Sequence, residues 1–297
     1  VRIPRLAEAH ALIECIPMRY FCVTPNSRRV HSMIIPKLPQ HSPKAVVEQT
    51  IGVTDVTVTY SRPGAKGRPI FGHLVPYGSI WRTAANAGSY IDFDHPVEIE
   101  GVTVPAGQYA LLTIPGPQEW TVILNKATKS ILAVPFDEAR NVAAFVLPVQ
   151  ETAFTETFTI GFERLSADAA SLAIAWETTK VSMRIEAPAT GQGLKNIDEA
   201  LAETDATPGN YHNAAAFCLD RGVRLAEALT WAKRSVELEP KFFTVHTLSR
   251  LYAANGMKAE AIDAARRSSE MSRSVGVESF VLLNDAAIRE WEGESVG

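Results

Sequence analysis

The sequence predicts an antiparallel β-sandwich, or a partly closed β-barrel, followed by an all-α domain of paired helices. Three observations lead to this prediction. Short segments that alternate apolar and polar residues, separated by turn residues, fill the chain from about residue 38 to residue 187. A run of small and turn-forming residues, APATGQG, follows at 187–193. Beyond it Ala, Leu, Glu, Lys and Arg predominate, and a helical pattern repeats.

The first two strands are expected in residues 45–62, AVVEQTIGVTDVTVTYSR, where apolar and polar residues alternate and GVTD marks a turn. Residues 63–80 hold three Pro and four Gly, which predicts a long structured loop. Further strands are expected in YIDFD, VEIEGVTVPAGQYALLTIP, EWTVILN, VAAFVLPVQ, AFTETFTIGFERL, AASLAIAWETT and KVSMRIEA. About eight to ten short strands at this spacing are typical of a sandwich or barrel.

The remaining segments complete the predicted domain organisation. Residues 1–37 are expected to be a disordered N-terminal extension, since 1–32 show neither a clear period nor the pattern of a secretory signal. The β domain is predicted over 38–187, a linker over 188–194 and the helical domain over 195–297. Trp120 and Trp176 lie in alternating strands and are predicted to be core residues.

The helical domain contains an internal repeat. Residues 222–240, GVRLAEALTWAKRSVELEP, resemble 256–272, GMKAEAIDAARRSSEMS, and Gly222 and Gly256 are 34 residues apart. With an apolar helix before each copy and Pro240 after the first, the region resembles the tetratricopeptide repeat. Trp231, Phe242, Phe243 and Tyr252 are then predicted to be repeat core. Two repeats are fewer than the ~3 that usually fold alone. We therefore expect the helices to pack on the β domain or on a second copy of themselves.

Composition limits the classes of function. A chain of 297 residues with 46% hydrophobic and 21% charged residues is ordinary for a globular protein of about two domains. Its net charge of −4 lacks the basic surplus of nucleic-acid binders. No stretch approaches the ~18 apolar residues of a membrane span. The three cysteines, Cys15, Cys22 and Cys218, fit neither a disulfide framework nor a zinc site.

A series of motifs in the β domain resembles one bacterial family. In order they are SPKA, YSRP, KGR, LVPYG, WRT, PAGQYAL and EWTVILN. Over about residues 38–187 the chain resembles the family called domain of unknown function 2911, some members of which carry a tetratricopeptide-like tail. The resemblance brings no assigned activity. It implies export to the periplasm or cell envelope, whereas this sequence shows no signal pattern, so the localisation is left open.

Candidate site residues gather in and beside the long loop. Two interpretations remain open. In the first, the side chains converge on a pocket for an anionic small molecule or a glycan, because Arg forks suit oxyanions and the Lys66–Gly67 turn resembles an anion-binding nest. In the second, they form a polar network that pins the loop, with Arg62 and Arg82 paired to Asp55, Asp92 or Asp94 and Trp81 in the core. The candidates are Tyr60, Arg62, Lys66, Arg68, Trp81, Arg82, Thr83 and Asn86.

No catalytic or metal-binding set is evident. Ser61 in YSRP lacks the G-x-S-x-G context of a nucleophile, although His73 and Asp92 or Asp94 would complete a triad on paper. His41, His73 and His95 lack the close spacing of metal ligands. Strand alternation would place Asp92 and Asp94 on one face and His95 on the other. We therefore expect no metal and no cofactor, and the catalytic residues, if the chain has any, are unassigned.

The predicted function is that of a binding or scaffold protein. The β-sandwich would present a cationic loop site for a small anionic or glycan ligand, and the helical repeats would bind a protein partner. The alternative is a hydrolase or isomerase that acts on an anionic or glycan substrate through residues 60–86. In that case the cationic side chains would stabilise developing negative charge.

Overall fold

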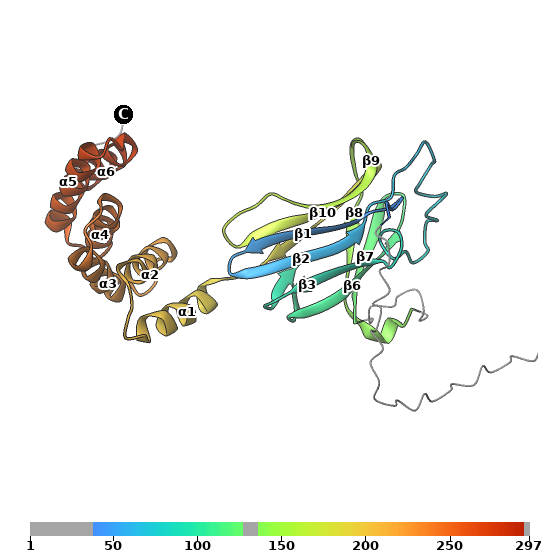
Figure 1. Ribbon diagram of the computed structural model, residues 1–297, viewed down its shortest axis with the longest axis horizontal. Helices are drawn as coiled ribbons and strands as arrows, with labels where there is room; N and C mark the ends of the chain where they lie inside the picture. Colours follow the sequence, from blue (N-terminus) through green and yellow to red (C-terminus); the bar gives the residue numbers. More distant parts are fainter. Residues whose placement is uncertain (1–37, 127–135, 294–297) are drawn as a thin grey trace, which may run out of the picture. The chain divides into compact units, whose positions relative to one another are not determined.

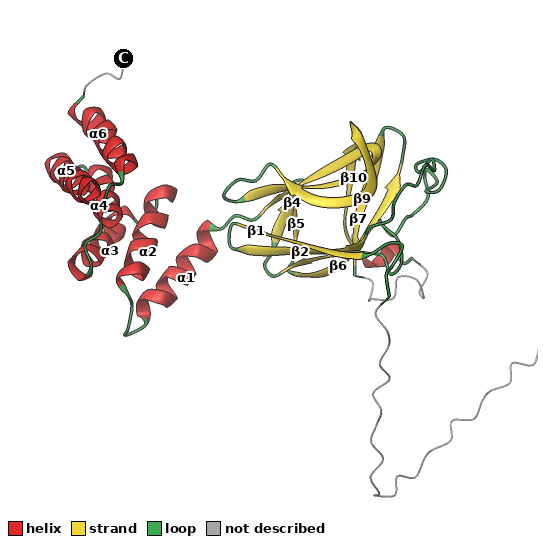
Figure 2. Cartoon of the chain, turned by 45° about the horizontal axis from the view of Figure 1, so that its top comes forward, coloured by secondary structure: helices red, strands yellow, loops and turns green. Residues whose placement is uncertain are grey.

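The computed structural model describes residues 38–126 and 136–293. In these residues all strands lie between Lys44 and Glu186, and all six α-helices follow from Thr190 onward (Figure 1, Figure 2). The predicted order of a β domain and then a helical domain is confirmed. The predicted N-terminal extension, residues 1–37, lies entirely outside the described residues.

Six antiparallel strands form the larger sheet, in the order β1-β2-β3-β6-β7-β8. Consecutive strands lie side by side except where β6 pairs with β3, because β4 and β5 belong to the other sheet. The bounds are β1 Lys44–Ile51, β2 Thr54–Ser61, β3 Ser89–Phe93, β6 Gly107–Pro115, β7 Glu119–Asn125 and β8 Asn141–Pro148. The β1–β2 hairpin turns at Gly52, whose φ is +62°.

The smaller sheet has four antiparallel strands, in the order β5-β4-β10-β9. Its bounds are β4 Val97–Ile99, β5 Val102–Val104, β9 Gln150–Glu163 and β10 Ala169–Glu186. The β9–β10 register shifts on both sides of Glu177, whose φ is +52°. Such a bulge redirects the side chain at its centre.

One apolar core lies between the two sheets. Val56 and Val58 of β2 contribute to it, as do Leu111 of β6 and Leu172 of β10. Their neighbours along β2 point to the other face of the sheet, which is the period of two that the sequence shows. On β6 and β7 that other face is also apolar and buried, with Ala110, Leu112 and Ile123 in a second, smaller cluster. Trp120 and Trp176 are 1% and 2% exposed, so their predicted core position is confirmed. Two packed sheets that do not close into a barrel make this a sandwich.

Residues 62–88, here called the crossing loop, connect β2 to β3. Gly64 forms a bridge to Thr157 of β9, and Trp81 forms a bridge to Thr113 of β6. The loop therefore leaves the larger sheet at β2, contacts the smaller sheet near its start, and contacts the larger sheet again before it reaches β3.

The helical domain begins earlier than predicted. Helix α1 (Thr190–Ala202) includes most of the segment expected to be a linker. The two glycines that suggested a linker, Gly191 and Gly193, lie in its first turn. A Cβ on Gly193 would come within 2.4 Å of the Phe217 ring, so this glycine allows α1 to approach its neighbour closely.

Five further helices follow in series. Their bounds are α2 Pro208–Arg221, α3 Leu225–Leu238, α4 Phe242–Ala254, α5 Lys258–Ser274 and α6 Glu278–Glu292. Each packs on the next, and α2 also contacts α4, as α4 contacts α6. Small buried residues, Ala215, Ala228 and Ala232, form much of the core and permit close helix packing.

The helix ends follow from local chemistry. Thr207 caps α2 through a reciprocal bond with Asn210, and Pro208 occupies the first helical position. Gly222 ends α2 with φ +65°. None of the helices in the described ranges is both long enough and apolar enough to span a bilayer.

Candidate functional site

The crossing loop inserts an aromatic ring between the two sheets. Trp81 stacks on Trp176 with ring centroids 6.2 Å apart, and it meets Phe158 edge to face at 5.4 Å. Phe71 of the same loop lies 4.8 Å from Trp120. Aromatic pairs in these arrangements stabilise a core beyond simple burial. Trp81 is thus part of the core of the sandwich.

Tyr60 and Arg62 bond to the smaller sheet. The Tyr60 hydroxyl donates to the Ile160 carbonyl at 2.9 Å. The Arg62 guanidinium donates to the Phe158 carbonyl at 3.3 Å and to the Thr159 hydroxyl at 2.8 Å. The partners predicted for Arg62 were aspartates, and that detail is wrong. Neutral acceptors on β9 satisfy the guanidinium, because the three aspartates lie at the opposite end of the β2–β3 pair, where Asp92 faces Thr57 and Asp94 bonds to Asp55.

The predicted anion nest at Lys66 holds a carboxylate of the chain itself. Lys66 and Gly67 both have positive φ, 54° and 68°. The Lys66 backbone N–H donates to Glu156 Oε1 at 2.8 Å. Arg68 folds back on the same turn and donates to the Gly64 and Ala65 carbonyls, at 2.8 and 2.9 Å. In this state the turn binds β9 through Glu156.

A second carboxylate anchors the middle of the crossing loop. The bulge in β10 directs Glu177 Oε2 toward the Ile70 backbone N–H, which donates to it at 3.2 Å. The Trp176 ring N–H, one residue earlier, donates to the Glu156 carbonyl at 3.2 Å. The irregular part of the β9–β10 pair therefore carries both acidic anchors of the loop.

Thr83 and Asn86 lie where the loop turns back toward β3, and both have a strained backbone conformation. Their φ values are +55° and +56°, which costs energy for a residue with a Cβ. The Thr83 hydroxyl bonds to Thr113 at 3.1 Å. The Asn86 amide donates to the Ser42 carbonyl at 3.0 Å and to the Ser61 hydroxyl at 3.3 Å. These bonds join the loop to β6 and to the start of β1.

Arg82 differs from the other candidates. It is half-buried, and its Nε is buried without a hydrogen-bond partner among the described residues. No ion pair joins it to an aspartate in that part of the chain. A buried guanidinium N–H that finds no acceptor is unfavourable. The Arg82 Nε–H is therefore able to donate a hydrogen bond to an acceptor atom of a ligand.

A second set of side chains forms an aromatic strip on the helical domain. It consists of His212 of α2, Phe242, Phe243 and His246 of α4, and Phe280 of α6, all half-buried. His212 meets Phe243 at 5.3 Å, and Phe280 meets Phe242 at 5.0 Å and His246 at 5.2 Å. Phe242 and Phe243, predicted to be repeat core, join this strip instead.

The sequence contains a signal for the strip, which is the spacing of its rings. His212 and His246 are separated by the same interval as Gly222 and Gly256, and Phe280 follows His246 by that interval again. The three rings therefore occupy equivalent positions on α2, α4 and α6. Helices at such positions repeat the same face, which makes a continuous surface feature.

Hydrogen bonds fix the orientation of His246. Ser268 donates to the Phe242 carbonyl at 2.8 Å, so its oxygen accepts from the Asn284 amide at 2.9 Å. This turns Asn284 Oδ1 toward His246 Nδ1, 2.6 Å away. His246 Nδ1 must then carry the proton, which leaves Nε2 as an acceptor. Burial lowers the pKa of His246, and it also lowers the pKa of His212.

Comparison with known proteins identifies the β-sandwich. Residues 42–185 match the model of a family described as "Protein of unknown function (DUF2911)". The β-sandwich is similar to this family. The DUF2911 match thus covers every strand from β1 to β9 and all of β10 except Glu186. No curated protein matches the chain. A solution structure of a protein from Bordetella parapertussis is similar at 15% identity and a TM-score of 0.30, covering 34% of this chain and 87% of that one.

The described residues of the β domain assemble no metal cluster. His95 does not point away from Asp94 as strand alternation suggested; its Nδ1 lies 2.9 Å from Asp94 Oδ1. The reason is that β3 ends at Phe93, so the alternation stops before these two residues. Among the cysteines, Cys218 is free and buried, and burial raises the pKa of its thiol. Cys15 and Cys22 lie outside the described residues.

Proposed function

We propose that this chain is a binding scaffold whose aromatic strip receives a peptide segment of a partner protein. The observation that carries the proposal is the strip itself, five half-buried rings from three helices, of which His212, His246 and Phe280 occupy repeat-equivalent positions. The pairing of α2 with α4 and of α4 with α6 supports a tetratricopeptide-like arrangement, because that architecture aligns alternate helices along one face.

The chemistry of the strip defines the partner. Phe242, Phe243 and Phe280 offer apolar area at low conformational cost, which suits aliphatic or aromatic anchors. The neutral His246 adds a hydrogen-bond acceptor at Nε2. A peptide that places an N–H or O–H donor beside an apolar side chain matches both features.

The test uses the full chain and a displayed peptide library. Peptides selected on the immobilised protein should lose at least about tenfold in affinity for Phe280→Ala, the size expected for a central aromatic anchor. Leu282→Ala is the matched control, since Leu282 lies on the same helix, is 64% exposed and is two positions from Phe280, which places it on another face of α6. Selected peptides that bind both variants equally would disprove the proposal.

A second candidate function is binding of a small anion at the crossing loop, which the unpartnered Nε of Arg82 favours. Thermal-shift measurements with inorganic phosphate and citrate should raise the melting temperature of the wild type and not of Arg82→Gln. Arg184→Gln, on the smaller sheet, should respond like the wild type. Equal responses of all three proteins, or none, would exclude this site.

The hydrolase or isomerase alternative depends on the same loop and stays a prediction. Its cationic groups would have to act on the substrate directly. Any turnover that survives both Arg62→Ala and Arg82→Ala would remove the crossing loop from consideration as an active site.

A further inference from the structure

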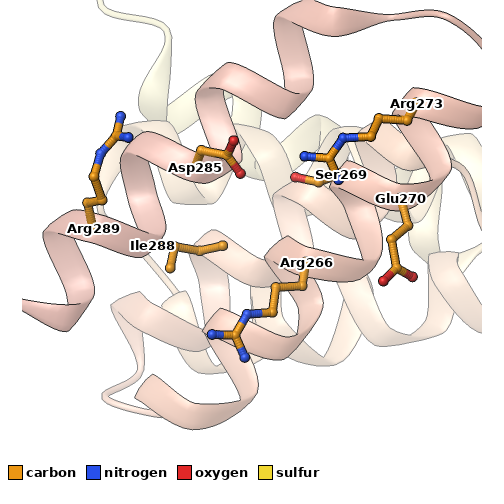
Figure 3. Close-up of a pocket in the computed structure, with 7 residues that line it drawn as sticks. All are labelled: Arg266, Ser269, Glu270, Arg273, Asp285, Ile288 and Arg289. Carbon is orange, nitrogen blue, oxygen red and sulfur yellow. The ribbon is translucent and has the colours of Figure 1, made fainter.

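The last helix pair contains a pocket that neither candidate function uses. It lies between α5 and α6 and has a volume of about 410 Å³. Figure 3 shows side chains from both helices around it, with Ile288 on the α6 side and Ser269, Arg273 and Asp285 near one another. A volume of this size holds a small molecule.

Ser269 gives this pocket an unused polar group. The residue is only 2% exposed, and its Oγ is buried without a hydrogen-bond partner among the residues described. A buried hydroxyl is normally hydrogen-bonded, so an unpartnered one calls for a ligand or an ordered water. Ser269 lines the pocket, and Figure 3 shows its oxygen on the side of Arg273 and Asp285.

The two charges beside Ser269 do not neutralise each other. No ion pair links Arg273 to Asp285, or either of them to another side chain, within 38–126 and 136–293. Arg266, across the pocket in Figure 3, lies 3.5 Å from Glu292. Glu270 and Arg289 also line the pocket, so apart from Arg266, which pairs with Glu292, two cations and two anions face this space. The Ser269 hydroxyl lies among them, and Ile288 adds an apolar wall.

We propose that this pocket binds a free α-amino acid with an aliphatic side chain. Arg273 and the Ser269 hydroxyl donate hydrogen bonds to the carboxylate, and Asp285 accepts from the ammonium group. The side chain packs on Ile288. A simple anion would pair with Arg273 but would be repelled by Asp285. A simple amine would pair with Asp285 but would be repelled by Arg273. A zwitterion pairs with both, so it fits the charge pattern best.

Titration of the ¹⁵N-labelled full chain with leucine tests the ligand class. Backbone signals of α5 and α6 should shift with a dissociation constant below about 10 mM, which is the range of weak small-molecule binding. Leucine amide, which lacks the carboxylate, and 4-methylpentanoate, which lacks the amine, should each bind at least about tenfold more weakly. Equal binding of inorganic phosphate or of either analogue, or no shift with leucine, would overturn the proposal.

Matched variants test the residues. Arg273→Gln and Asp285→Asn should each lower leucine affinity by about tenfold or more, whereas Arg267→Gln, on the same helix but outside the pocket lining, should leave it unchanged. Ser269→Ala should weaken binding, and Ser272→Ala is its control. Ser272 carries the same kind of buried, unpartnered hydroxyl in α5 but does not line the pocket. Equal effects in Ser269→Ala and Ser272→Ala would remove the hydroxyl from the site.

Discussion

Replacement of Trp81 by alanine tests whether the crossing loop is the closure of the sandwich. The ring lies within about 6 Å of four others, at 6.1 Å from Phe71, 6.2 Å from Trp120, 5.4 Å from Phe158 and 6.2 Å from Trp176. A fully buried Trp→Ala change costs about 3–5 kcal/mol. Because Trp81 is half-buried, we expect the lower end, about 3 kcal/mol, which is roughly a 150-fold change in the unfolding equilibrium.

The assay must separate the β domain from the helices, since a chain of two parts need not unfold in one step. Hydrogen exchange in urea, read from peptides covering 106–125 and 155–176, reports on the two sheets that the loop contacts. Leu74→Ala is the control in the same loop; Leu74 is 50% exposed, so its loss should cost less than about 0.5 kcal/mol. A loss below about 1 kcal/mol for Trp81→Ala would refute the reasoning.

Three further predictions concern charge and packing. Burial opposes the ionisation of Glu163, but hydrogen bonds from Lys180 and Ser182 outweigh burial and lower its pKa. The ionised carboxylate should therefore stabilise the fold above the unfolded pKa of about 4.5, and this contribution should be lost as the pH falls through the lower pKa of the folded state. The difference in stability between the wild type and Glu163→Gln should accordingly shrink on acidification. His246 should titrate below about 6.5 with its proton on Nδ1, and an NMR titration showing a higher midpoint or an Nε2-bound proton would contradict the network. Gly191→Ala should stabilise α1 by about 0.5–1 kcal/mol, whereas Gly193→Ala should displace the Phe217 ring and destabilise it; equal thermal shifts would contradict that packing.

The sequence predicted the strands well because their side-chain period is local. β2 and β10 alternate, and the two sheets follow from that pattern. It also predicted the nest at Lys66, since positive φ at a Lys–Gly pair is a local property. It could not show that Glu156 fills the nest. That contact joins residues 90 apart and depends on how β9 meets the loop.

Two other misses have different causes. The start of α1 was placed too late because glycine was weighed by helix propensity alone, whereas Gly193 is retained by its contact with Phe217. The aromatic strip was missed because Phe242 and Phe243 are ordinary core residues by composition. The sequence signal for the strip was the equal spacing of His212, His246 and Phe280.

The crossing loop also determines when this protein can fold during synthesis. Tyr60 bonds to a residue 100 positions later, and Ile70 to one 107 positions later. At about 5–20 residues per second, the loop is made roughly 5–20 s before its partners on β9 and β10 exist. Until then the apolar face of the larger sheet is uncovered. The helices, whose contacts span about one repeat, acquire their partners almost as soon as they emerge. The slow step in making this protein is therefore the β-sandwich, and a chaperone that holds it would act on the chain before residue 177 appears.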